Sequence, residues 1–193
     1  MKFFLKQSFL PALYVVLMDF TAFGVCSMDA GVEWLQLILL IGNLALYVYV
    51  VAVMAFKDGQ DAVKIRNAND VERRFIIETG EDRPLKEAEE YKPWKGFIPG
   101  LIVCVPLIIF IIVHTILLLC GNTIEWIEFA INVPYFLVSG VFAVLKVPNV
   151  YFTLLAIPFI CGATGIPYIL GARKYERQQE QIKQKHAKIY GNK

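Results

Sequence analysis

The stretch "WLQLILLIGNLALYVYVVAVMAF", Trp34–Phe56, decides the fold class of this chain. It contains no acidic or basic side chain. A helix needs about 20 predominantly apolar residues to cross the hydrocarbon core of a bilayer, at a rise of about 1.5 Å per residue. The stretch is long enough for one crossing, so we predict a membrane-spanning helix here.

Further hydrophobic segments lie on both sides of this stretch. They are Phe9–Cys26, Phe97–Cys120, Ile127–Leu145 and Val150–Ala172. Hydrophobic residues make up 57% of the 193 residues, whereas soluble domains contain roughly 45–50%. The sequence therefore predicts an all-α, polytopic membrane helix bundle with five hydrophobic segments, and it leaves no room for a second, soluble domain.

The first segment is expected to be a retained helix rather than a cleaved signal peptide. Asp19 interrupts its apolar core, and no small-x-small cleavage pattern follows it. Pro11 is expected in its first turn, where the missing N–H costs nothing. Residues 1–56 would form a first pair of transmembrane helices, and residues 96–172 a second transmembrane region.

Residues 57–95 form a polar loop between these two regions. Apolar residues recur in it at helical spacing, at Ile65, Ala68, Val71, Phe75 and Ile76. This pattern predicts an amphipathic helix that lies on the membrane surface or on a neighbouring element. Gly80 is expected to end that helix as the residue after its C-cap.

The distribution of basic residues predicts which side of the membrane each segment occupies. Lys and Arg side chains stay on the cytoplasmic side of short loops. The N-terminus carries two of them, the loop nine and the tail 173–193 seven, and Lys146 completes the total of 19. With both termini cytoplasmic, four segments cross fully and one of the five is re-entrant or interfacial.

Two segments compete to be the incomplete one. Ile127–Leu145 is short and follows Glu125, so we favour an interfacial position for it. Alternatively, "VEWLQ" at Val32–Gln36 resembles "IEWIE" at Ile124–Glu128, which hints at a repeated helix pair. In that case Ile127–Leu145 would cross, and Val150–Ala172 would be broken around "PFICGATGIP".

Polar residues inside the hydrophobic segments are the candidates for chemistry. Asp19, Asn43 and His114 form a candidate intramembrane site, because intramembrane carboxylates and histidines are costly and usually functional. Asn43 is equally well explained as a hydrogen-bonding residue between helices. A candidate acidic outer face comprises Asp29, Glu33, Glu125 and Glu128, which would concentrate cations.

The motifs of common enzyme classes are not found in the sequence. It contains no nucleophile motif, metal-ligand spacing, phosphate loop or dinucleotide fingerprint. We therefore expect a non-enzymatic protein without a cofactor, an accessory or regulatory helix-packing component of the plasma membrane. The alternative is a small cation- or proton-coupled transporter that uses Asp19, Asn43 and His114. Expected partners are the lipid bilayer, another membrane protein or a second copy, and anionic lipid headgroups at the basic tail, but not nucleic acid.

Overall fold

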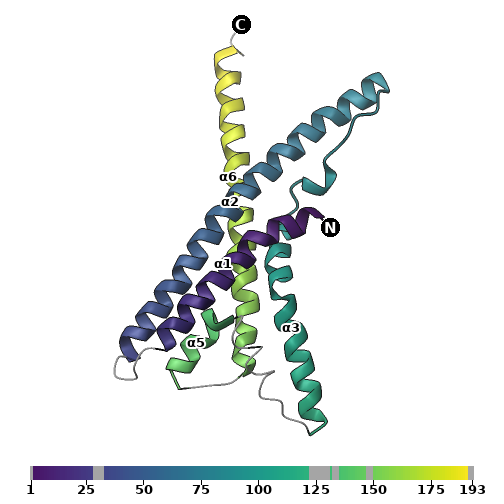
Figure 1. Cartoon of the computed structure of the whole chain (residues 1–193). Helices are drawn as coiled ribbons and strands as arrows, with labels where there is room; N and C mark the ends of the chain where they lie inside the picture. The colour runs from purple at the N-terminus through teal and green to yellow at the C-terminus, as the bar shows by residue number, and fades with distance from the viewer. Residues whose placement is uncertain (1, 28–32, 122–130, 132–134, 147–149, 191–193) are drawn as a thin grey trace.

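The computed structural model describes residues 2–27, 33–121, 131, 135–146 and 150–190. These residues form the α-helices α1 (Lys2–Cys26), α2 (Glu33–Thr79), α3 (Ile98–Leu119), α5 (Phe136–Val144) and α6 (Ala156–Tyr190), with short 3-10 helices η2 (Glu87–Glu89), η3 (Pro93–Phe97) and η5 (Val150–Leu155) (Figure 1). Over the described ranges the chain contains no strand. The predicted all-α class is confirmed.

Four of these helices, α1, α2, α3 and α6, are long and apolar enough to cross a membrane. By contrast, α5 has only nine residues, which corresponds to about 14 Å against a hydrocarbon core of about 30 Å. α5 is the described helix of the segment Ile127–Leu145, most of whose first half lies outside the described residues. The break expected around "PFICGATGIP" in the alternative is wrong, because α6 runs as one helix through Pro158 and Pro167.

The first helix begins earlier than the sequence pattern indicated. α1 already includes Lys2, so Pro11 lies in its middle rather than in its first turn. The basic and polar residues before Phe9 do not prevent helix formation, since the hydrophobic pattern marks the part in lipid and not the helix end. Pro11 is buried, and its ring takes part in the packing of α1.

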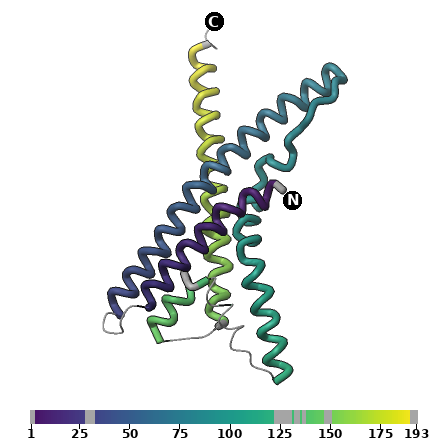
Figure 2. The backbone as a smooth tube through the Cα atoms, viewed as in Figure 1, coloured from purple at the N-terminus to yellow at the C-terminus, as the bar shows by residue number. Residues whose placement is uncertain are grey.

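The second helix is also longer than expected. α2 has 47 residues, or about 70 Å at the rise of an α-helix. The predicted amphipathic helix is the continuation of the spanning helix, and it projects along the same axis (Figure 2). No turn separates Phe56 from Lys57, and the buried residues of this part lie against neighbouring elements, Gly59 against Tyr168 of α6 and Asn69 against Glu90. Its predicted apolar face is not the packed one: Val71 is 65% exposed, whereas Gly59, Ala62 and Asn69 are buried. Gly80 does end the helix, with a φ of 74° and an N–H bonded to the carbonyl of Ile76.

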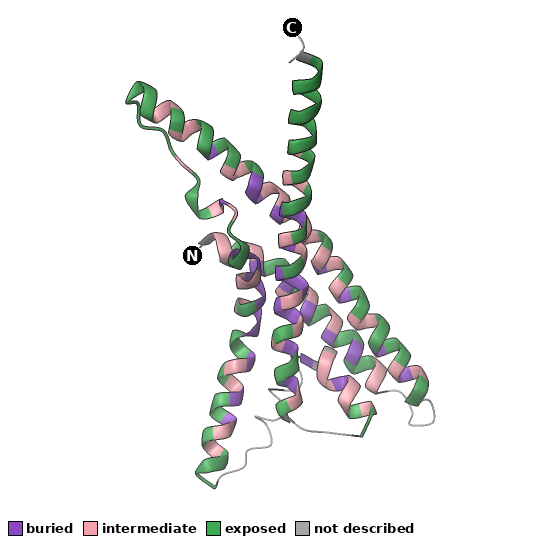
Figure 3. Ribbon diagram, turned by 180° about the vertical axis from the view of Figure 1, so that it is seen from behind, coloured by how far each residue is buried: buried purple, intermediate pink, exposed green. Residues whose placement is uncertain are grey.

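α6 is the central helix of the bundle and packs against both α2 and α3. Glycines let the backbones meet: a Cβ on Gly59 would overlap the backbone of Tyr168, and a Cβ on Gly171 would overlap the carbonyl of Phe56. Close approach through small residues is how helices gain packing energy in lipid, where apolar burial between helices gives little. The outer faces carry large exposed apolar side chains, as expected for contact with lipid (Figure 3).

Most of the basic residues lie at one end of the helix bundle. α1 and α3 begin, and α2 and α6 end, at the same end of the bundle, which we call the basic end (Figure 1). Lys146 is an exception: at the opposite end its ammonium group lies 2.8 Å from the carboxylate of Glu33 at the start of α2. This pair places one basic group beside a member of the predicted acidic outer face.

Candidate intramembrane site

Asp19 is a buried carboxylic acid within a spanning helix. Its side chain is 6% exposed. Residues four apart on α1, Gln7, Pro11, Val15 and Asp19, point the same way, and the last three are buried. Because placing a carboxylate in the bilayer centre costs at least ~2.5–3.5 kcal/mol, such a residue requires polar neighbours.

Two tyrosines provide hydroxyl groups near this carboxyl group. Tyr47 on α2 is completely buried and lies within electrostatic range of Asp19, as does Tyr135 next to α5. The Tyr135 hydroxyl donates a hydrogen bond to the carbonyl oxygen of Val103 at 2.7 Å. The Tyr47 hydroxyl has no hydrogen-bond partner among the described residues. A buried hydroxyl without a partner is uncommon, and it marks a place where a proton, water or ligand is to be expected.

Two thiols complete the cluster on the side of α3 and α6. Cys104 and Cys161 are both buried and are in hydrogen-bonding contact with each other. The contact is possible because Gly100 lets α3 approach the backbone of α6 at Cys161. Tyr47 lies within electrostatic range of both thiols. Four spanning helices thus each contribute a polar side chain to one buried region.

Asn43 binds α1 directly. Its side-chain nitrogen donates to the carbonyl oxygen of Met18 at 2.8 Å, and the Thr21 hydroxyl donates to its oxygen at 3.0 Å. The amide is half-buried and holds α1 to α2. These bonds correspond to the interhelical role that the sequence allowed for this residue.

His114 is buried on α3, but it is not among the described residues that act electrostatically on Tyr47 and Tyr135 near Asp19. Its side chain is 6% exposed, and its ring packs edge-on against the ring of Tyr151, with 6.1 Å between centroids. Tyr135, which is near Asp19, bonds to Val103 of α3, and His114 lies about 16 Å farther along that helix. The structure therefore buries Asp19 and His114 in different parts of the bundle.

The predicted acidic outer face is described in part. Glu33 is exposed and paired with Lys146. Asp29, Glu125 and Glu128 lie outside the described residues. One ion pair in solvent contributes little, about 0–1 kcal/mol, so the pair does not by itself define a cation site.

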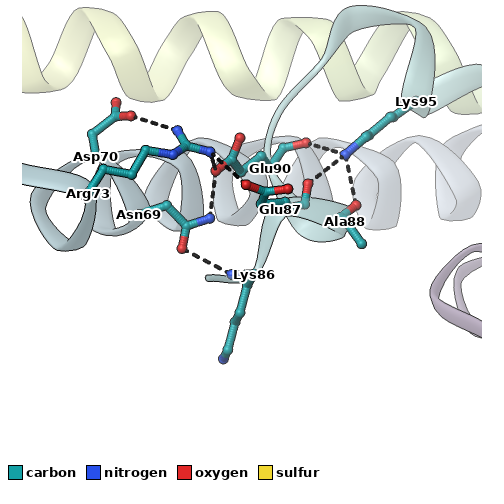
Figure 4. A network of polar contacts seen from close by, with 8 residues as sticks. All are labelled: Asn69, Asp70, Arg73, Lys86, Glu87, Ala88, Glu90 and Lys95. Carbon is teal, nitrogen blue, oxygen red and sulfur yellow. Dashed lines mark hydrogen bonds and ion pairs between the residues drawn. The ribbon is translucent and has the colours of Figure 1, made fainter. Parts of the chain in front are cut away.

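A second polar cluster lies at the basic end, and the sequence pattern did not indicate it. Glu90, 8% exposed, accepts hydrogen bonds from the amide of Asn69 at 2.7 Å and from the guanidinium of Arg73 at 2.6 Å (Figure 4). The oxygen of Asn69 accepts the backbone N–H of Lys86 at 3.2 Å. The segment between α2 and α3 is thereby fixed against the projecting part of α2.

Lys95 holds this segment from its other side. Its buried ammonium group donates to the backbone carbonyls of Glu87, Ala88 and Glu90 at 3.3, 2.8 and 2.9 Å (Figure 4). Burial, and then Lys92, lower the pKa of Lys95, while Glu90 acts in the opposite direction. The three carbonyls satisfy the three donors of an ammonium group, which assigns Lys95 a structural role.

The chain matches no protein-family model, no curated protein sequence and no solved structure. Among the described residues, no group of three or more His, Cys, Asp or Glu side chains is arranged to hold a metal ion. The function is therefore argued from the geometry of the two buried clusters.

Proposed function

We propose that this chain is a plasma-membrane protein that crosses the bilayer four times, through α1, α2, α3 and α6, with α5 as part of the incomplete segment. Both termini lie in the cytoplasm. The support is the grouping of basic segments: the start of α1, the segment from Lys57 to Lys95 and the end of α6 lie at one end of the bundle (Figure 1). Because basic segments resist translocation, that end faces the cytoplasm.

We further propose that Asp19 binds a proton, and that the chain is a small proton-coupled transporter rather than an enzyme. The observation that carries this proposal is a buried carboxyl group within electrostatic range of Tyr47, whose hydroxyl has no hydrogen-bond partner among the described residues and is free to bond to it. A tyrosine hydroxyl can donate to an ionised carboxylate and accept from a protonated one. The same pair therefore stabilises both states, as a reversible proton site requires.

The donor set suits a proton better than a hard metal cation. Magnesium and calcium ions take about six to eight oxygen ligands, several of them carboxylates. The neighbours identified for Asp19 are tyrosine hydroxyls, and thiols lie beyond Tyr47.

Carbodiimide labelling tests proton binding directly. Dicyclohexylcarbodiimide enters lipid and reacts with protonated carboxyl groups, and mass spectrometry locates the adduct. We expect labelling of Asp19 in purified protein to fall as pH rises, to disappear in Asp19→Asn and to persist in Glu33→Gln. Absence of labelling between pH 5 and 8 would refute the proton site.

Proton movement tests the coupling. In proteoliposomes with pyranine inside, an imposed pH gradient should collapse at least ten times faster with the wild-type chain than with Asp19→Asn. Equal rates in matched preparations would count against transport and leave Asp19 a packing residue.

A role as an accessory component is the second candidate, and α6 favours it. Beyond Ala172 the helix continues away from the bundle, and its side chains are mostly exposed, including Ile189 at 68%. Such a helical arm can pair with another helix, while Arg173 and Lys174 at its base meet anionic headgroups. The role predicts a protein that co-purifies with the full chain and is lost when residues 176–193 are removed. Recovery of the chain alone, at a single size, would oppose it.

A further inference from the structure

A narrow crevice opens near the basic end of the bundle. Its volume is about 20 Å³, enough for roughly one water molecule. Gln7 of α1, Asp58 of α2 and Tyr168 of α6 line it, together with Pro99 of α3. Val51 and Thr164 line it as well, and both lie farther along their helices toward Asp19.

The crevice and Asp19 lie on the same faces of the helices that surround them. On α1, Gln7 and Pro11 line the crevice, and Asp19 follows at the same four-residue spacing. On α2, Asp58 and Val51 line it, and Tyr47 lies one turn beyond Val51. Side chains three or four residues apart share a helix face. The inner end of the crevice therefore points toward Tyr47 and Asp19, with Pro11 and Asp19 about 12 Å apart along α1.

On α6 as well, the residues that line the crevice share a helix face with a residue of the buried site. On α6, Tyr168 and Thr164 line the crevice, and Cys161 follows one turn farther in. Cys161 is one of the thiols within electrostatic range of Tyr47. Polar groups from two helices thus continue from the inner end of the crevice to the buried site.

We propose that this crevice is the water-filled inlet through which protons pass between the basic end of the bundle and Asp19, with Asp58 at its mouth and Tyr47 as the last hydroxyl before the carboxyl group. The inference rests on the proposed proton site at Asp19. The inlet specifies the route by which protons reach Asp19 and the side of the membrane from which they come.

Between the inlet and Asp19, valine side chains surround the few polar groups of this path. Val15, Val51 and Val103 are buried in one cluster with Tyr47. Hydrophobic constrictions of this kind close a path by excluding water and open when side chains move apart. The valines keep the site closed at rest, and the Tyr47 hydroxyl shortens the distance that water has to bridge.

Asp58 is suited to collect protons at the mouth. Burial, and then the neighbouring carboxylate of Asp61, raise the pKa of Asp58 to about 6, while Lys57 opposes the shift. From α6 the phenol of Tyr168 faces it, and from α1 the neutral amide of Gln7 lines the same crevice. A carboxyl group that titrates near pH 6 exchanges protons readily close to neutral pH.

Thiol modification tests whether the inlet holds water. Thr164→Cys and Ala55→Cys place a thiol in the crevice, while Ile166→Cys and Val53→Cys place one at nearly the same depth on the exposed faces of the same helices. A membrane-impermeant, positively charged methanethiosulfonate reagent is added to either side of sealed vesicles, and mass spectrometry reads each site separately from the native cysteines. We expect at least tenfold faster modification at Thr164→Cys than at Ile166→Cys, from the side of the basic end only. Ala55→Cys and Val53→Cys provide an independent pair.

Carbodiimide labelling then tests whether the inlet serves Asp19. In vesicles with different internal and external pH, labelling of Asp19 should follow the pH at the basic end. Prior modification of Thr164→Cys should slow that response at least fivefold, and prior treatment of Ile166→Cys should not. Equal reactivity within both thiol pairs, labelling that follows the opposite side, or an unslowed response would overturn the inlet while leaving the proton site in place. Loss of all labelling would instead remove the proton site itself.

Discussion

Two buried carboxyl groups, Glu90 and Asp19, have almost the same exposure but opposite surroundings. Glu90 lies in the segment before α3 and receives hydrogen bonds from Arg73 and Asn69. Asp19 lies within a spanning helix, and its identified neighbours include the hydroxyls of Tyr47 and Tyr135. Burial alone therefore does not distinguish a structural carboxylate from a functional one.

The partners make the difference. A guanidinium neutralises a carboxylate permanently, because arginine keeps its charge at every pH that a cell meets. Glu90 is thus held beside a permanent positive charge, and its bonds hold one segment to α2. A hydroxyl group accepts either protonation state of its neighbour. In the proposed proton site, the hydroxyl groups near Asp19 therefore suit both its protonated and its ionised form.

The largest expected effect comes from removing the cation beside Glu90. Arg73→Leu leaves a buried charge without its counter-ion, and breaking such pairs costs about 3–5 kcal/mol, so we expect about 3 kcal/mol because Arg73 is partly exposed. Thermal unfolding in detergent measures the loss, and limited proteolysis locates it in residues 80–97. The exposed neighbour provides the control: Arg74→Leu should stay within about 0.5 kcal/mol. Similar effects of both variants would show that Glu90 does not depend on Arg73.

Replacing the carboxyl groups of Glu90 and Asp19 by neutral amides should change the stability of the protein by different amounts. Glu90→Gln loses charge-assisted hydrogen bonds and should destabilise the protein by about 1–3 kcal/mol. Asp19→Asn removes a carboxyl group from an apolar bundle, so the free energy of unfolding should change by less than about 1 kcal/mol, or rise. Both variants are compared by thermal unfolding in the same detergent at pH 7. The reverse order would make Asp19 the structural residue of the two.

A third carboxyl group adds a pH dependence of known sign. The pKa of Asp58 is raised from 3.8 to about 6, so the folded chain binds its proton more tightly than the unfolded chain does. Its contribution to stability is present below pH 3.8 and is lost as pH rises to about 6. Carbon-13 NMR of aspartate-labelled protein should show a carboxyl group titrating near pH 6 that is missing in Asp58→Asn. Titration near pH 4 would contradict the burial that we assign to it.

The smallest effect is expected at the exposed link between the two projecting helices. The guanidinium of Arg66 lies 2.8 Å from the carboxylate of Glu176, and both side chains are about one-third exposed. Ion pairs in such positions contribute about 0–1 kcal/mol. Arg66→Ala should therefore lower the unfolding temperature far less than Arg73→Leu does. A comparable loss would mean that α2 and α6 depend on this pair for their arrangement.

The spanning helices were predictable from the sequence, and their full lengths were not. Long apolar runs mark helices that are able to cross lipid, so all four helices of sufficient length and apolarity were predicted. The same runs say nothing about the helix that continues into water, and therefore the start of α1 at Lys2 and the continuation of α2 past Phe56 were missed. The end of α2 was predicted, because Gly80 adopts the positive φ that a helix end often requires.

Of the residues in the buried cluster around Asp19, the sequence predicted only Asp19 itself. Asp19 is conspicuous in an apolar segment, and the structure buries it. Tyr47 resembles the other aromatic residues of α2, and only its position opposite α1 distinguishes it. On the projecting part of α2 the packed face carries Gly59, Ala62 and Asn69, so hydrophobic periodicity selected the wrong side. A helix face that packs through glycine and charged or polar residues has no hydrophobic periodicity, so the sequence pattern does not reveal it.

The unbroken course of α2 has a mechanical consequence. Asn43 lies near the start of α2, and about 54 Å of helix separate it from Thr79, where α2 ends. A straight rod of this length works as a lever: a rotation of about 5° at its base displaces its tip by about 5 Å. Any rearrangement around the partners of Asn43 on α1 is thus magnified at the far tip of α2, a long way from the place where it began.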